Sequence, residues 1–247
     1  MAQRGPVAQR GPVAQRGPVA QRGPVPDRVR VPDRVRVPDR VGAVAGSVGV
    51  LVLSAAWITA GVRTAGFDPV RQSISQLQRE GTATGAMLTA AFVVFAGGAL
   101  LLVPVLGRRI SRTAGAVLAV AAVATLGAAA SPLGEVRGGR QDAVHLGFGS
   151  IGYASLSVLP LIAGWALRHR APRAAAVSFL LGTVASACLL GTVPADAVSG
   201  ALQRVGFVAV HTWLLGFCAI VLLQPGLLSQ EARRSSAGAR WRGSRSA

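Results

Sequence analysis

The sequence predicts an all-α integral membrane protein, a bundle of six transmembrane helices, and three observations predict it. Hydrophobic residues make up 51% of the 247 residues and charged residues only 14%, against roughly 25% charged in a typical soluble domain. Six apolar segments have the length of about 20 residues that crosses a bilayer core as a helix. Arginines gather in alternate connections between these segments. The composition excludes a water-soluble enzyme.

The chain divides by composition into a tail at 1–41, a transmembrane domain at 42–225 and a basic tail at 226–247. Residues 2–25 are four copies of Ala-Gln-Arg-Gly-Pro-Val, and the six-residue period then continues as Pro-Asp-Arg-Val-Arg-Val. Each repeat carries a proline and too little apolar bulk for a solenoid core, so we interpret both tails as disordered. The repeats are either an electrostatic tether or, as we prefer, a repeat expansion or a start site assigned too early.

The predicted spans are separated by charged or turn-rich connections. None contains an acid or an arginine, as the cost of placing such groups in lipid requires. Ser131-Pro132 is expected to stop or kink the third span. The six spans are residues 42–62, 85–106, 114–133, 143–167, 174–194 and 205–223.

The arginines predict the orientation. Of 26 basic residues, all arginine, 20 lie in the two tails and in the second and fourth connections, which fall on one side of a six-span protein. Basic residues are retained on the cytoplasmic side of a membrane. We therefore expect the protein in the cytoplasmic membrane, with both termini in the cytoplasm. This asymmetry accounts for the net charge of +17, so binding to nucleic acid is not predicted. The predicted partners are therefore membrane lipids, and self-association is left open.

The first outer connection predicts a short amphipathic helix. Asp68 is placed to cap it, Pro69 suits its first position and Gly81 can end it. One apolar stripe at helical spacing runs along it, formed by Phe67, Val70, Ile74 and Leu77. We expect the helix to lie at the outer interface or over the mouth of the bundle. The opposite face offers hydrogen-bonding groups to a head group or solute, Ser75 and Gln76 among them.

Two histidines lie in or beside predicted spans. Asp142 and His145 are three residues apart on one helical face, so the carboxylate either orients the imidazole or only caps span four. His211 lies inside span six and is expected to face the bundle and bond to a serine or a carbonyl of another helix. Two histidines and a carboxylate suffice for zinc, but nothing brings them together, so no metal and no other cofactor is predicted.

Two further patterns have structural explanations. Gly147-Phe-Gly-Ser-Ile-Gly152 matches the dinucleotide fingerprint but sits inside span four with no preceding strand, so it predicts close helix packing. Cys188 and Cys218 lie at depths that differ by roughly 10 Å, too far apart for a disulfide.

Short segments of the chain resemble the domain of unknown function 998 family of six-span membrane proteins. The resemblance rests on Asp68-Pro-Val-Arg-Gln-Ser-Ile-Ser-Gln-Leu77, on His145 at the start of span four, and on Gly200-Ala-Leu-Gln-Arg-Val205 before span six. It covers about residues 42–225 and departs at Ser131-Pro-Leu-Gly-Glu135, where the acid comes later than in the family pattern. The resemblance implies six spans, no established activity, and these candidates: Ser73, Ser75, His145, Gln203 and Arg204.

The sequence thus predicts a non-enzymatic membrane protein that binds a lipid head group or small solute in an outer-leaflet vestibule. An intramembrane lipid hydrolase using Asp142, His145 and a serine of the first connection is one alternative, and a small-solute transporter is another. The candidate ligand-binding residues are Ser73, Ser75, Gln76, Asp142, His145, Gln203, Arg204 and His211.

Overall fold

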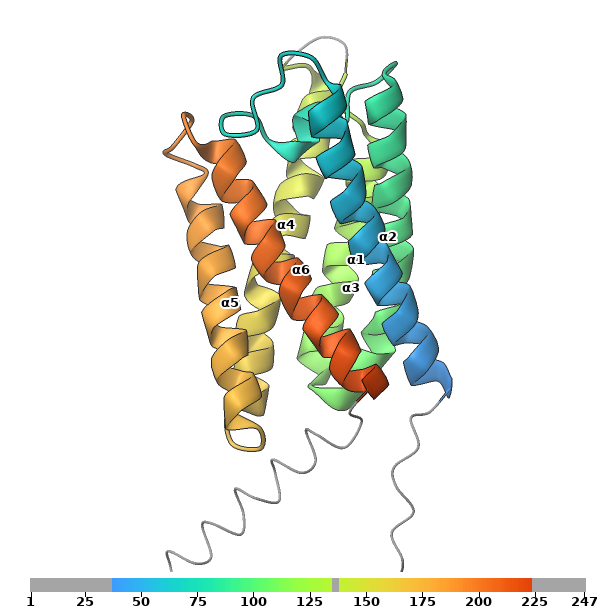
Figure 1. Ribbon diagram of the computed structural model, residues 1–247, viewed down its shortest axis with the longest axis vertical. Helices are drawn as coiled ribbons and strands as arrows, with labels where there is room; N and C mark the ends of the chain where they lie inside the picture. The colour runs from blue at the N-terminus through green and yellow to red at the C-terminus, as the bar shows by residue number, and fades with distance from the viewer. Residues whose placement is uncertain (1–36, 135–137, 224–247) are drawn as a thin grey trace, which may run out of the picture. The chain divides into compact units, whose positions relative to one another are not determined.

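The computed structural model describes residues 37–134 and 138–223, so the tails predicted to be disordered lie outside it except for the last few residues of the first. Its helices form an up-and-down bundle (Figure 1). They are α1 (Val37–Arg63), the 3-10 helix η1 (Ile74–Leu77), α2 (Ala83–Arg109), α3 (Arg112–Ala130), α4 (Arg140–Leu167), α5 (Pro172–Gly191) and α6 (Ser199–Leu223). The all-α prediction is confirmed for the described residues.

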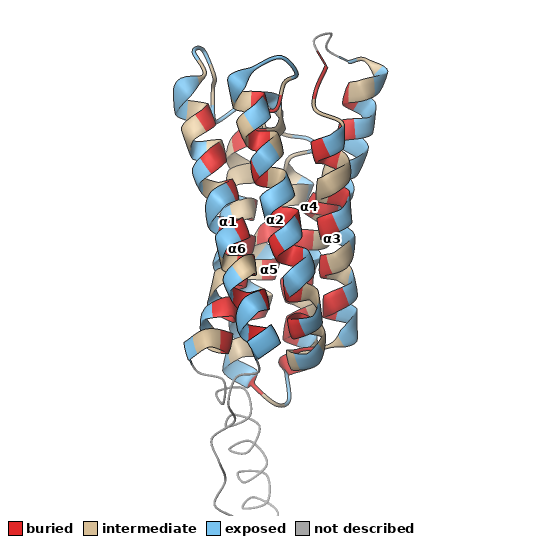
Figure 2. Ribbon diagram, turned by 90° about the vertical axis from the view of Figure 1, so that its right-hand side faces the viewer, coloured by how far each residue is buried: buried red, intermediate tan, exposed pale blue. Residues whose placement is uncertain are grey.

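All six α-helices are long and apolar enough to cross a membrane, with mean hydropathy of 1.6 to 2.4 over their best 18-residue windows. Figure 2 shows exposed residues along the outward faces and buried residues between the helices. The outward faces carry large apolar side chains, such as Leu51, Val123 and Leu180, at 56%, 58% and 64% exposure. A surface of this kind is stable against lipid and not against water. The chain is a multi-pass integral membrane protein.

The helices are arranged as a ring. Each packs against the next along the chain, α6 packs against α1, and α4 also touches α6. Glycines allow the closest approaches: a Cβ on Gly49 would lie 3.0 Å from the Phe95 Cα, and one on Gly98 would overlap the Ala45 carbonyl. The close packing predicted for Gly147-Phe-Gly-Ser-Ile-Gly152 is found only at Gly152, whose Cβ position lies 3.6 Å from the Cβ of Ala124 on α3, whereas no atom lies within 4 Å of a Cβ on Gly147 or Gly149.

The bundle has two distinct ends. At one, here called the arginine end, α1 begins, α6 ends, and α2–α3 and α4–α5 are joined by short turns. At the other, here called the loop end, lie the longer connections 64–82, 131–139 and 192–198. Because α3 ends at Ala130, the stop predicted at Ser131-Pro132 is confirmed.

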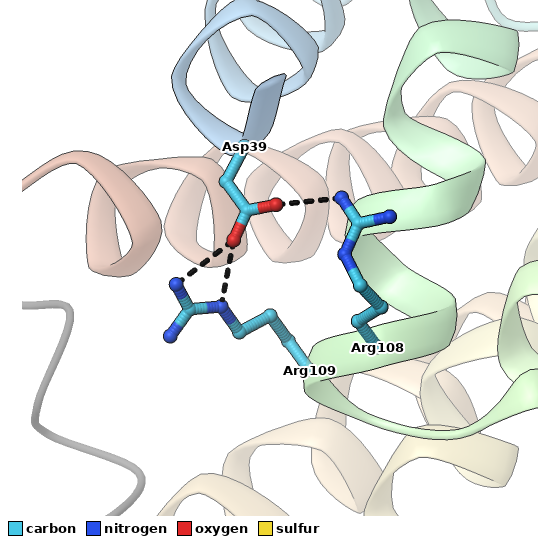
Figure 3. A network of polar contacts seen from close by, with 3 residues as sticks. All are labelled: Asp39, Arg108 and Arg109. Carbon is cyan, nitrogen blue, oxygen red and sulfur yellow. Dashed lines mark hydrogen bonds and ion pairs between the residues drawn. The ribbon is translucent and has the colours of Figure 1, made fainter. Parts of the chain in front are cut away.

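At the arginine end, a buried carboxylate joins α1 to α2. Asp39, 2% exposed, accepts from Arg108 at 2.6 Å and from the Nη2 of Arg109 at 2.9 Å (Figure 3). Arg170 of the α4–α5 turn donates to the carbonyls of Arg109 and Ile110 at 2.9 and 2.7 Å. These tertiary partners stabilise the part of α1 that precedes the predicted span at Gly42, since Val37 already belongs to the helix.

Replacing Asp39 with asparagine is expected to lower the free energy of unfolding by about 1.5–3 kcal/mol, because hydrogen bonds to charged groups are worth that much. The arginines are partly exposed, at 45% and 25% for Arg108 and Arg109, so water solvates the charges left behind and the lower part of the range is expected. Thermal unfolding in detergent measures the change. Asp196→Asn, at an exposed position, is the control; equal melting temperatures for the two variants would contradict the prediction.

A short helix is present in the first connection, as predicted, but it is shorter and of a different type. Asp68 caps only one turn, its Oδ1 accepting from the amides of Val70 and Arg71 at 2.9 and 3.3 Å. The chain then turns and forms η1, which buries Ile74 and Leu77. Val70, expected on the apolar stripe, is 47% exposed.

Tertiary hydrogen bonds explain why the helix predicted over 67–80 does not form. The Ile74 amide bonds to the Gln203 side chain at 2.7 Å instead of to a carbonyl of its own helix. The Gln78 carbonyl accepts from the Leu133 amide at 2.9 Å, and the Leu133 carbonyl accepts from the Glu80 amide at 2.8 Å. Backbone groups needed for a continuous helix are thus committed to α6 and to the α3–α4 connection.

Candidate binding cavity at the loop end

Residues 64–82, here called the roof loop, are fastened to the start of α6. Nη1 of Arg204 donates to the carbonyls of Pro69 and Gln72 at 2.7 and 2.8 Å. Its guanidinium also lies 5.2 Å from the centre of the Phe67 ring. The Ala201 amide donates to the Val70 carbonyl at 2.9 Å. Arg204 therefore holds the roof loop in place.

The other side of the roof loop is fastened to α2 and α3. The buried Gln78 side chain donates to the Thr89 hydroxyl at 3.0 Å and to the Ala128 carbonyl at 3.4 Å. Arg79 donates to the Gly134 carbonyl at 2.7 Å. With anchors on α2, α3 and α6, the roof loop places Ser73, Ile74 and Ser75 across the loop end.

Arg204→Ala is expected to loosen the roof loop, because two carbonyls of that loop lose a charged donor. The amides of residues 68–76 should exchange with deuterium about tenfold faster, since about 1.4 kcal/mol of closing free energy corresponds to a tenfold change. Hydrogen–deuterium exchange with mass spectrometry in nanodiscs measures this. Arg71→Ala removes the same charge from an exposed position in the loop and should leave exchange unchanged. Matching exchange in both variants would show that Arg204 is not the anchor.

A cavity of about 270 Å³ lies beneath the roof loop. Every helix of the bundle contributes to it. Its polar lining includes Ser73, Ser75, His145, Ser150, Ser199 and Gln203. Its aromatic lining is Trp57, Phe92, Tyr153 and Phe207. No arginine, aspartate or glutamate from the part of the chain that the structure describes lines it.

His145 is held at the cavity by the end of α3. The side chain is 2% exposed, and its Nδ1 lies 3.1 Å from the Ala128 carbonyl and 2.8 Å from that of Ser131. Carbonyl oxygens only accept, so Nδ1 carries a hydrogen and donates. In the neutral imidazole, Nε2 is then a hydrogen-bond acceptor. The ring orientation is therefore fixed by backbone groups.

The other polar groups around the cavity differ in how many of their hydrogen bonds are already made within the protein. The Ser73 and Ser75 hydroxyls share a hydrogen bond of 3.0 Å, which uses one of their two hydrogens. The Gln203 side-chain oxygen accepts from Ile74, and the Tyr153 hydroxyl donates to the Gln203 carbonyl at 3.4 Å. The indole nitrogen of Trp57 is buried and has no partner among the described residues.

The structure brings together four of the eight predicted site residues, namely Ser73, Ser75, His145 and Gln203. Asp142 instead accepts from the amides of Gly134 and Gly138 at 2.9 and 2.8 Å, and so shapes the α3–α4 connection. Gln76 lines a separate depression in the roof loop. Arg204 is occupied in fastening that loop.

His211 has the structural role predicted for it. Its Nδ1 shares a hydrogen bond of 2.9 Å with the Ser54 hydroxyl of α1. The ring lies between Phe95 and Phe207, with centroids 5.9 and 5.6 Å away. The expected bond to a serine of another helix is confirmed, and His211 joins α6 to α1 and α2.

The arrangement needed for hydrolysis is not assembled in the described residues. Both oxygens of Asp142 bind backbone amides, and the partners of His145 are carbonyls and not serine hydroxyls. Residues 37–134 and 138–223 also hold no group of three His, Cys, Asp or Glu side chains placed for a metal ion. Cys188 and Cys218 are both free thiols, as their predicted depths require.

The aromatic lining was not found from the sequence. Phe92, Tyr153 and Phe207 lie in apolar spans, where nothing in their neighbours distinguishes a cavity-facing ring from a lipid-facing one. One signal was available, since Tyr153 is the single tyrosine of the chain and follows His145 by eight residues, about two helical turns.

The cavity does not continue through the tightly packed region beneath it. On the side of the arginine end, the interior is filled by buried apolar side chains, including Val50, Leu102, Leu156, Leu159 and Leu214. This fold and cavity define a polytopic α-helical membrane protein with a roofed chamber at one end.

The family comparison agrees with this class. The model of the family described as "Protein of unknown function (DUF998)" matches residues 47–220, and the chain belongs to that family. The match includes α2 to α5 in full and most of α1 and α6, and it confirms the family resemblance inferred from the sequence. Comparisons with curated proteins and with solved structures found no match.

Proposed function

We propose that this membrane protein binds a lipid head group or a small polar solute in the cavity beneath the roof loop. The observation that supports this most directly is His145. Its Nδ1 is fixed by two α3 carbonyls, and the ring lines the cavity. The free acceptor Nε2 is then the group available to a ligand.

The lining favours a ligand that both donates and accepts hydrogen bonds. One serine hydrogen at Ser73 or Ser75 is a donor without a described partner. His145 supplies an acceptor. Since no arginine or acidic side chain among residues 37–134 and 138–223 lines the cavity, a group with net charge would lose its hydration with no opposite charge from these residues to replace it. A neutral head group is therefore favoured.

The distribution of arginines supports an orientation with the arginine end in the cytoplasm. The cavity would then lie in the outer leaflet of the cytoplasmic membrane. The packed apolar interior beneath it favours binding over transport, because transport requires a polar path across the midplane. The occupied oxygens of Asp142 likewise favour binding over hydrolysis.

Native mass spectrometry of the full-length protein released from nanodiscs is the test. The wild type should carry a bound molecule, and His145→Leu should carry it at about one tenth of the occupancy or less, a change of about 1.4 kcal/mol. His169→Gln, in the turn at the arginine end, should retain it. Equal occupancy in wild type and His145→Leu, or no bound molecule in either, would reject this function.

A further inference from the structure

One face of α4 packs against α5 in its later part and is exposed in its earlier part. Ser150, Ser157 and Gly164 are spaced by seven residues, which is two turns, so all three lie on the same face. Gly164 lies against α5, with a Cβ position 3.2 Å from the Ala175 carbonyl. Ser157 is fully buried, and its carbonyl accepts from the Ser186 hydroxyl of α5 at 3.4 Å. Ser150 is exposed.

The contact between α4 and α5 is therefore closed at Ser157 and Gly164 and open at Ser150. The residues bordering the open part also line the cavity: Leu146 and Ser150 on α4, and Leu189 on α5. Leu146 is 54% exposed. The cavity thus reaches the outer surface of the bundle between these two helices.

This opening lies within the membrane-spanning part of α4. Ser150 is ten residues after Arg140, the first residue of α4, which is about 15 Å along a helix. The roof loop covers the end of the bundle and is fastened by Arg204 and Gln78. Among the described residues, the side between α4 and α5 is therefore the more open way into the cavity, because the roof loop covers the end of the bundle.

The two parts of the lining match the two parts of an amphiphile. Hydrogen-bonding groups of His145, Ser73 and Ser75 lie toward the roof, whereas Leu53, Phe92 and Phe207 form an apolar lower wall. A volume of about 270 Å³ holds a head group and the first part of a chain, and the rest of the chain would extend through the opening into the surrounding lipid.

From these features we infer that the ligand is a neutral, hydroxyl-bearing lipid, of the glycerol-ester class, which enters sideways from the bilayer between α4 and α5. The inference rests on the proposed function and specifies its ligand class and route. Its hydroxyl donates to Nε2 of His145 and accepts from a serine of the roof loop. Its first chain carbons pass between Leu146 and Leu189.

The test uses a photoactivatable monoacylglycerol incorporated into nanodiscs with the full-length protein. Ser150→Trp places a large ring in the opening, and Ile151→Trp places the same ring on the neighbouring, 52% exposed, lipid-facing position. Labelling of cavity residues should fall about tenfold in Ser150→Trp, a change of about 1.4 kcal/mol, and should be unchanged in Ile151→Trp. Unlabelled monoacylglycerol should compete, whereas free glycerol and phosphatidylglycerol should not.

The outcomes separate this inference from the function on which it rests. Undiminished cavity labelling in Ser150→Trp would overturn the lateral route while leaving the binding function intact. Competition by glycerol or by phosphatidylglycerol would overturn the ligand class. If the probe never labels the cavity but native mass spectrometry still shows a molecule lost in His145→Leu, the lipid inference fails and the binding function stands. Absence of both signals would reject both.

Discussion

Replacing Gly149 with leucine should greatly weaken binding in the cavity without unfolding the protein. Gly149 lines the cavity, and a Cβ placed on it meets no atom within 4 Å. The isobutyl group would therefore extend into the space that a ligand occupies. We expect about a hundredfold loss of ligand affinity, a change of about 2.8 kcal/mol, measured by occupancy in native mass spectra.

Gly147→Leu is the matched control for this variant. Gly147 lies two residues earlier in α4, is exposed, and also has open space at its Cβ position, but it does not line the cavity. Both substitutions remove a glycine from a helix, so both should favour helix formation similarly. Equal occupancy in the two variants would place the ligand elsewhere.

Replacing Gly98 with alanine should be among the most destabilising single changes in the bundle. The added Cβ would overlap the carbonyl oxygen of Ala45, a backbone atom of α1 that cannot rotate away. Overpacking of this kind costs about 1–3 kcal/mol. The α1–α2 contact would have to open, and the melting temperature in detergent should fall accordingly.

Gly97→Ala provides the control on the same helix. Gly97 is exposed and has no atom within 4 Å of its Cβ position. It gains the same helix propensity, about 1 kcal/mol, with no collision. Thermal unfolding should therefore rank Gly97→Ala at or above the wild type and Gly98→Ala clearly below it. A Gly98→Ala protein as stable as the Gly97→Ala protein would show that α1 and α2 are free to separate.

The spans could be predicted because lipid requires that a crossing helix be predominantly apolar over about 20 residues. The extension of α1 to residues before Gly42 could not, because Asp39 in this part of the helix is paired with Arg108 and Arg109, which follow about 70 residues later. The length of the helix predicted within the roof loop was wrong for the same reason. Its amide at Ile74 is bonded to Gln203, far along the sequence.

The candidate site was predictable where polar residues interrupt apolar sequence, as at Ser73, His145 and Gln203. Polarity alone did not separate residues that face the cavity from those that hold the scaffold. Arg204 and Asp142 are as conspicuous as His145 in the sequence, yet both bind backbone groups of connecting segments. That distinction depends on which backbone groups lie nearby, and only the folded chain determines it.

The hydrogen bonds that fasten the roof loop have a consequence for how its position depends on pH. Arg204 donates to backbone carbonyl oxygens, and the Gln203 side chain accepts from a backbone amide. None of these hydrogen bonds involves a carboxylate that could be protonated. Arginine itself stays charged at any biological acidity. In the proposed orientation, these two fastenings of the chamber's cover would therefore persist when the external medium became acidic.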